Sequence, residues 1–317
     1  MTYDLNSRQN ISWFGAFFIL LGLMGAGLII GSFAGFGIFA AMTGKGLGQF
    51  EKEMQNPANL QAIRIVQLVS TFFMFFLPAY LTALIINRKP GKFLGFNFYF
   101  SAKQFAVVIA IMLAALPLVG SLAELNKIIP LPASLEKTFK GLEDAYSKTV
   151  LVLSKITGFA DYIYALIVMG LAPAIFEEVF FRGGMQNILT RWMKNPLMAI
   201  IITSILFSLI HGSWYGFLPR IALGIILGLL YQYSGSLWIA ILAHFFHNGL
   251  IVTQIYYLTV KGKPIEDSMN ETMPLWWGII GLVVLWALFI VFRKNAEKER
   301  KEKFPPEDRA VEEKWMA

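Results

Sequence analysis

Residues 162–182 read YIYALIVMGLAPAIFEEVFFR, an uncharged run that ends in two adjacent glutamates and an arginine. A carboxylate at membrane depth costs about 2.5–3.5 kcal/mol on insertion scales, so such groups are usually paired, face a protein interior and mark function. On a helix, Glu178 and Arg182 lie four residues apart and face each other, whereas Glu177 points about 100° away from Glu178. We therefore expect Glu178 to be a structural carboxylate paired with Arg182, and Glu177 to be chemically available.

The composition of the whole chain is that of a polytopic membrane protein. Of its 317 residues, 56% are hydrophobic and 15% are charged, and the mean hydropathy is +0.60, which is more apolar than a soluble domain. The net charge of +7 does not indicate nucleic acid binding, because the basic residues lie in loops and a tail that flank apolar segments. The absence of cysteine excludes disulfides, thiolate metal sites and cysteine nucleophiles.

Eight apolar segments predict an all-α fold, a polytopic membrane helical bundle with about eight transmembrane helices. They cover residues 11–43, 65–86, 105–123, 162–181, 196–210, 217–233, 237–260 and 275–292. In the first segment, Gly27, Gly31 and Gly35 recur every fourth residue, which favours close helix packing over a functional site. Pro78 and Pro117 predict kinks in the second and third segments.

A segment of different character separates the third and fourth spans. Between residues 127 and 158, apolar residues recur at steps of three and four among lysines and glutamates: Leu135, Phe139, Leu142, Tyr146, Val150 and Leu153. This pattern predicts an amphipathic helix that lies on the membrane surface or packs over the bundle. A role in gating substrate access is the alternative interpretation.

The distribution of basic residues predicts the orientation of the bundle. With eight spans, both termini lie on one side, and Lys and Arg are more frequent on that side. The positive-inside rule then places both termini in the cytoplasm of a bacterial-type cell. The charged residues after Phe292 are expected to form a solvated tail.

The candidate catalytic residues follow the glutamate pair. The protein has three histidines, and all of them lie in or at the end of apolar segments: His211, His244 and His247. His244, His247 and Asn248 occupy an arc of about 100° on one helix. If the helix of Glu177 continues to a turn near Lys194, Glu177 and His211 are equally far from that turn and lie at one depth on antiparallel helices. A carboxylate, imidazoles and an amide would then meet in one low-dielectric pocket.

Such a set of side chains suits hydrolysis of an acyl bond. A carboxylate and an imidazole can orient and deprotonate water, while imidazole and amide donors can stabilise an oxyanion. No nucleophilic serine is indicated, because the chain contains no Gly-x-Ser-x-Gly turn. Glu177, His211 and His244 could also hold zinc, although the helical His-Glu-x-x-His pattern is absent.

Three motifs occur in order over residues 177–248: Glu177-Glu178-x-x-x-Arg182, Phe207-x-x-x-His211 and His244-x-x-x-Asn248. They resemble the motifs of the CAAX-processing and bacteriocin-processing (CPBP, or Abi) family of intramembrane proteases, and the resemblance covers residues 162–260. It implies an endopeptidase in which Glu177 and His211 activate water while His244 and Asn248 form the oxyanion site. Family members have been described as glutamate-dependent and as metalloproteases. We therefore expect no required cofactor, with zinc as the alternative. His247 lies outside the motifs.

The resemblance also divides the chain into regions. N-terminal membrane helices and the amphipathic connecting helix cover 1–160, the catalytic membrane core covers 161–260, a last transmembrane helix covers 261–292 and the charged cytoplasmic tail covers 293–317. The expected partners are membrane lipid and a peptide or protein substrate that arrives from the bilayer or its interface. A non-catalytic scaffold and a proton-coupled transporter are alternatives, since buried Glu and His residues also relay protons.

Overall fold

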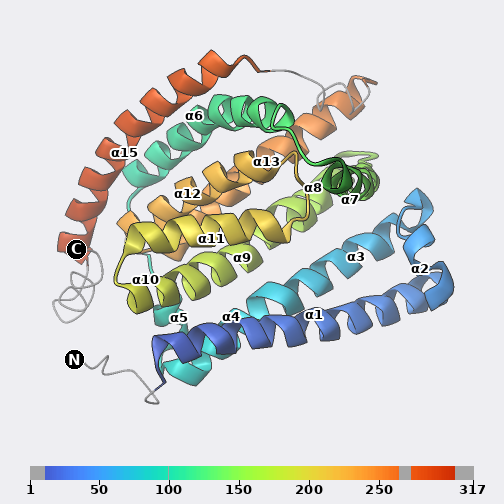
Figure 1. The fold of residues 1–317 in the computed structure, drawn as a ribbon, viewed down its shortest axis with the longest axis horizontal. Coiled ribbons are helices and arrows are strands. Elements are labelled where there is room, and N and C mark those ends of the chain that lie inside the picture. The colour runs from blue at the N-terminus through green and yellow to red at the C-terminus, as the bar shows by residue number, and fades with distance from the viewer. Residues whose placement is uncertain (1–10, 99, 264–272, 304–317) are drawn as a thin grey trace.

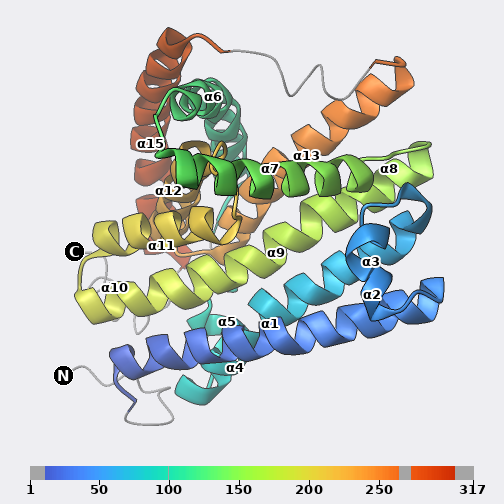
Figure 2. The same cartoon turned by 45° about the vertical axis from the view of Figure 1, so that its right-hand side comes forward.

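The bundle consists of helices in three groups. The computed structural model describes residues 11–98, 100–263 and 273–303, and every regular element within them is a helix. On one side α1 (Trp13–Thr43) packs against α3 (Leu60–Thr71) and α4 (Leu77–Ile86), and on the other side α6 (Ala102–Lys127) pairs with α15 (Leu275–Lys303) (Figure 1). The central group lies between them (Figure 2). It comprises α8 (Phe159–Ala165), α9 (Ala172–Glu178), α10 (Asn187–Met193), α11 (Pro196–Ile210), α12 (Phe217–Ser234) and α13 (Leu237–Val260).

The predicted all-helical membrane bundle is confirmed, with one difference among the spans. Seven helices of the described residues are long and apolar enough to cross a membrane: Trp13–Thr43, Pro57–Ile86, Ala102–Lys127, Phe159–Met193, Phe217–Ser234, Leu237–Val260 and Leu275–Lys303. The other predicted span, α11, has 15 residues, so it is about 22 Å long against a hydrocarbon core of about 30 Å. Helix α1 begins and α15 ends at the same end of the bundle (Figure 1). The cytoplasmic location of that end stays a prediction.

The glycine stripe of α1 allows the second span to approach closely, as predicted. Gly27, Gly31 and Gly35 are all buried. A Cβ atom on Gly27 would collide with the carbonyl oxygen of Phe73, and one on Gly31 would lie 3.0 Å from the Phe73 Cβ. Only hydrogen atoms fit at these positions, so the stripe serves packing.

We expect Gly27→Ala to destabilise the protein by about 1–3 kcal/mol, because the added methyl group overpacks against backbone that cannot move away. Gly37→Ala is the matched control on the same helix, since nothing lies within 4 Å of its Cβ position. There the substitution should be neutral or stabilising, because alanine favours a helix more than glycine does. Thermal unfolding in detergent measures both, and equal melting temperatures would contradict the close approach.

Two of the longest spans contain wider π-helical turns. Two such π-helical segments are Phe72–Phe76 and Leu166–Leu171. The first ends two residues before Pro78, and the second ends two residues before Pro173. A proline lacks the N–H group and clashes with the carbonyl four residues earlier, which here falls inside the π-helical segment. Pro117 instead lies inside the continuous helix α6.

The last helix continues further than predicted. Helix α15 ends at Lys303 rather than at Phe292, so the first part of the expected tail is helical. The extension carries Arg293–Glu297 and Lys303–Glu299 ion pairs of 3.0 and 2.7 Å, four residues apart, a spacing that supports helix formation. It also buries Ala296. Residues 304–317 of the predicted tail lie outside the described residues. Two short helices were not predicted, α2 (Leu47–Glu53) and α5 (Pro90–Phe93).

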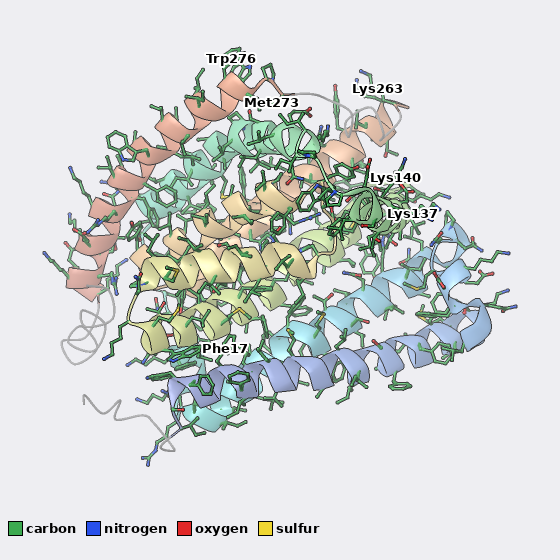
Figure 3. The ribbon with its side chains drawn as sticks, in the orientation of Figure 1. Phe17, Lys137, Lys140, Lys263, Met273 and Trp276 are labelled. Atoms are coloured by element: carbon green, nitrogen blue, oxygen red, sulfur yellow. The ribbon has the colours of Figure 1, made fainter. Side chains whose placement is uncertain are left out.

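The predicted amphipathic helix is present as α7 (Ala133–Leu153). Its last residues, Val152 and Leu153, are buried, whereas Leu135 and Leu142 are exposed. It therefore packs firmly at its C-terminal end and presents part of its apolar face outward. Figure 3 labels Lys137 and Lys140 on α7, far along the bundle from Phe17 near the start of α1.

Candidate active site

The predicted site residues come from three parts of the central group. Two glutamates close α9, the arginine lies in the π-helical segment Val179–Gln186, one histidine directly follows α11, and the last pair projects from α13: Glu177, Glu178, Arg182, His211, His244 and Asn248. The predicted turn between the first two parts is present, because α10 ends at Met193 and Lys194 adopts a left-handed conformation. The π-helical winding after Glu178 was not predicted. Such local widening is frequent at functional sites.

Glu178 and Arg182 form the ion pair that their spacing predicts. Arg182 Nη1 lies 3.0 Å from Glu178 Oε1, and the two side chains are 1% and 0% exposed. Arg182 Nη2 also donates to the carbonyl oxygen of Gly224 in α12 at 3.0 Å. A Cβ atom on Gly224 would lie 2.8 Å from that of Ser204 in α11, so a glycine lets α12 approach closely. No motif includes Gly224, so this partner was not predicted.

Glu178 also contacts the third motif. His244 Nδ1 lies 2.9 Å from Glu178 Oε1, the oxygen that Arg182 approaches. An ionised carboxylate can only accept, so the His244 Nδ1–H group donates to it. This contact joins the first and third motifs inside the bundle. The spacing of Glu178 and Arg182 on one helix predicts their pairing but not this contact.

His211 is oriented by its own motif. Its Nδ1 lies 2.7 Å from the carbonyl oxygen of Phe207, which fixes the proton on Nδ1 and leaves Nε2 of the neutral ring free to accept one. The Phe207 ring packs 4.8 Å from the imidazole of His211 and 6.1 Å from that of His244. Arg182 lies over the same ring at 5.2 Å. The ring of Phe207 therefore contacts one side chain from each motif: Arg182, His211 and His244.

Glu177 differs from its neighbour as the sequence predicts. Its side chain is buried, yet within the described residues its carboxylate has neither a hydrogen bond nor an ion pair. Among the described residues no direct contact joins its carboxylate to Arg182 or to His211. The arrangement is compatible with a chemically available carboxylate.

Two other polar residues of α13, Asn248 and His247, make fewer polar contacts than His244 does. Asn248 is half-buried, and in the described part of the chain its amide has no hydrogen bond. His247 is buried, and its Nδ1 atom has no partner among the described residues. The structure thus brings His244 into the network of the first motif but leaves Asn248 and His247 outside it.

The proposed zinc ligands do not form an assembled set. Catalytic zinc sites commonly use three protein ligands, but within residues 11–98, 100–263 and 273–303 no group of three or more His, Asp or Glu side chains is arranged to hold a metal ion. Glu177, His211 and His244 therefore do not fit a preformed zinc centre in this conformation.

Comparisons with known proteins agree with the predicted resemblance. Residues 159–250 match the family model described as type II CAAX prenyl endopeptidase Rce1-like, and this segment contains all three motifs. The chain is also 28% identical over 110 residues to the uncharacterized protein YpbD of Bacillus subtilis (strain 168). That alignment covers 33% of this chain and 53% of YpbD, so the chain spans about half the length of this curated relative. No solved structure matches.

Proposed function

We propose that this protein is an intramembrane endopeptidase whose active site is formed by the three motifs. One observation carries the proposal: within the segment that matches the Rce1-like family, Glu178 of the first motif contacts His244 of the third, and the Phe207 ring of the second motif packs against both His211 and His244. Buried ionisable residues are costly in a membrane protein and mark function by default.

Glu177 and His211 activate the attacking water. Glu177 is the one carboxylate of the motifs with no partner in the described residues, so it can accept the proton that water loses. His211 presents an unprotonated Nε2 because the Phe207 carbonyl holds its Nδ1–H. The water oxygen bonds to the carbonyl carbon of the peptide, the C–N bond then breaks, and the proton passes to the departing amine.

His244 and Asn248 stabilise the oxyanion that forms on the peptide carbonyl. Since Nδ1 of His244 donates to Glu178, Nε2 carries a donor proton only when the ring is cationic. Glu177, Glu178 and Arg182 together carry one net negative charge, and a cationic His244 brings the cluster to neutrality. Glu178 in this mechanism both pairs with Arg182 and orients His244.

The family match favours a substrate that carries a prenylated cysteine near its C-terminus, in the Cys-aliphatic-aliphatic-X arrangement. The test uses the full-length protein in liposomes with a farnesylated peptide of this type and its unprenylated counterpart. Mass spectrometry should detect the released C-terminal tripeptide, and its release should depend on Glu177. Absence of cleavage of both peptides would favour the scaffold alternative.

Removal of metal separates the proposed mechanism from its zinc alternative. We expect the protein to keep its cleavage rate after dialysis against a chelator, with metal analysis near zero, because Glu177 and His211 activate the water themselves. A zinc enzyme would instead contain about one metal ion per chain, lose activity on dialysis and regain it with zinc. Stoichiometric zinc whose loss and return tracks activity would overturn the metal-free mechanism.

A further inference from the structure

Arg220 is a cation beside the proposed active site that no motif includes. It lies near the start of α12 and is half-buried. Its Nη1 donates to the carbonyl oxygen of Ser213 at 3.2 Å, two residues after His211. Its guanidinium lies over the ring of Tyr146 at 5.4 Å. The hydrogen bond to Ser213 ties Arg220 to the loop that follows the proposed catalytic imidazole.

Arg220 has no carboxylate partner within the described part of the chain. Other arginines there do have one: Arg64 pairs with Asp161, Arg182 with Glu178 and Arg293 with Glu297. Glu143 of α7 lies in the same region, but its Oε2 accepts a hydrogen bond from Ser213 Oγ at 2.6 Å. A half-buried guanidinium with most of its donors unused is well suited to bind a carboxylate, which it can contact through two parallel hydrogen bonds.

Helix α7 covers this region. The rings of Phe139 and Trp214 stack with their centroids 5.4 Å apart. Glu143 contacts Ser213 in the loop after His211, and Tyr146 contacts Arg220 near the start of α12. Three residues of α7 thus hold it over the segment that leads from the catalytic histidine to Arg220. A ligand bound there would be shielded from solvent, which strengthens a charge-assisted hydrogen bond.

We propose that Arg220 binds the C-terminal carboxylate of the substrate and thereby makes a free carboxylate end a requirement for efficient cleavage. The proposal rests on the proposed function. An apolar, membrane-anchored C-terminal segment carries one obligatory charge, its terminal carboxylate, and Arg220 supplies the opposite charge at the site. A substrate held in this way places a peptide bond a few residues from its end beside Glu177 and His211.

The experiment compares two farnesylated peptides of one sequence, one ending in a free carboxylate and the other in an amide. Wild-type protein in liposomes should cleave the acid with a kcat/KM roughly 10- to 100-fold higher than the amide, mainly through KM, as expected for a hydrogen bond between charged groups. Arg220→Gln should reduce this ratio to about 1, and Arg220→Lys should retain an intermediate preference. Because each ratio is taken within one variant, a general loss of activity cancels.

Arg293→Gln is the matched control, because Arg293 also lies over a tyrosine, Tyr233, at 5.6 Å, but beside the opposite end of α12 from Arg220. It should keep the wild-type ratio. Equal cleavage of acid and amide by the wild type, or an unchanged ratio in Arg220→Gln, would overturn the proposal. If the wild type cleaves neither peptide, the proposed function fails instead. Binding of the tripeptide acid and of its amide to wild type and to Arg220→Gln then tests the role of Arg220 alone: a preference of the wild type for the acid that is lost in Arg220→Gln supports it, and an equal preference in both proteins overturns it.

Discussion

Glu177→Gln is expected to lower the rate of peptide cleavage by about 10²–10⁴-fold, the usual contribution of a general base. Glutamine has nearly the volume of glutamate but cannot accept the proton from water. Folding should be preserved, because within the described residues Glu177 has no hydrogen bond or ion pair to lose. Single-turnover cleavage of the farnesylated peptide in liposomes measures the rate, and thermal unfolding measures the stability of the same preparation.

Glu124→Gln is the matched control for this substitution. Glu124 lies on α6, is partly exposed and pairs with Lys127 at 2.9 Å, far from the three motifs in the sequence. Turnover by Glu124→Gln should equal that of the wild type. Near-normal turnover by Glu177→Gln would exclude Glu177 as the base, and a loss of folded protein would show that its role is structural.

Much of the fold was predictable because a membrane restricts the allowed structures. Backbone polar groups in the hydrocarbon region must be satisfied within a helix or barrel, so long apolar segments predict helices directly. The bounds of α11 and α13 agree with the prediction. The extension of α15 was missed because hydropathy detects where a helix leaves the apolar layer, not where it ends. Its charged residues continue the helix through ion pairs such as Arg293–Glu297.

Local departures from regular helix were harder to predict. The π-helical segment Val179–Gln186 changes the directions of the side chains after Glu178, and sequence periodicity assumes a regular helix. Prolines mark the other two π-helical segments, but no proline lies in or shortly after this one. Arg182 within this segment donates a hydrogen bond to the carbonyl oxygen of Gly224 on a neighbouring helix, a contact that sequence periodicity does not predict.

The partners of the candidate site were only partly predictable. The turn at Lys194 is present, and counting residues from it predicts that Glu177 lies near the level of His211, which stays a prediction. Such counting does not give the rotation of α13 about its own axis. That rotation determines which side chains of α13 face α9, and it brings His244 into contact with Glu178. The contribution of Arg220 was missed for a related reason, since it belongs to no motif and becomes relevant only when α12 and α7 meet the loop after His211.

Glu178→Ala and Arg182→Ala are each expected to destabilise the protein by about 3–5 kcal/mol, because each leaves the other charge buried without its partner. The pair is suited to this effect, since its side chains are almost fully buried and 3.0 Å apart. Arg293→Ala is the control in a pair of the same residue types, spacing and distance that is 62% and 56% exposed, and it should change stability little. Thermal unfolding and the yield of folded protein measure the three variants. Wild-type melting of both buried-pair variants would contradict the assigned role of the pair.

The double variant Glu178→Leu/Arg182→Met separates the two roles of Glu178. With both charges removed and apolar side chains in their place, no charge is stranded, so the double variant should be more stable than either single variant. Catalysis should not recover with stability, because His244 Nδ1 loses the carboxylate that orients its ring and balances its charge. A double variant that regains both stability and cleavage would mean that Glu178 only neutralises the charge of Arg182 and does not orient His244. Recovery of stability without cleavage is the expected result, since the same carboxylate oxygen accepts from both Arg182 and His244.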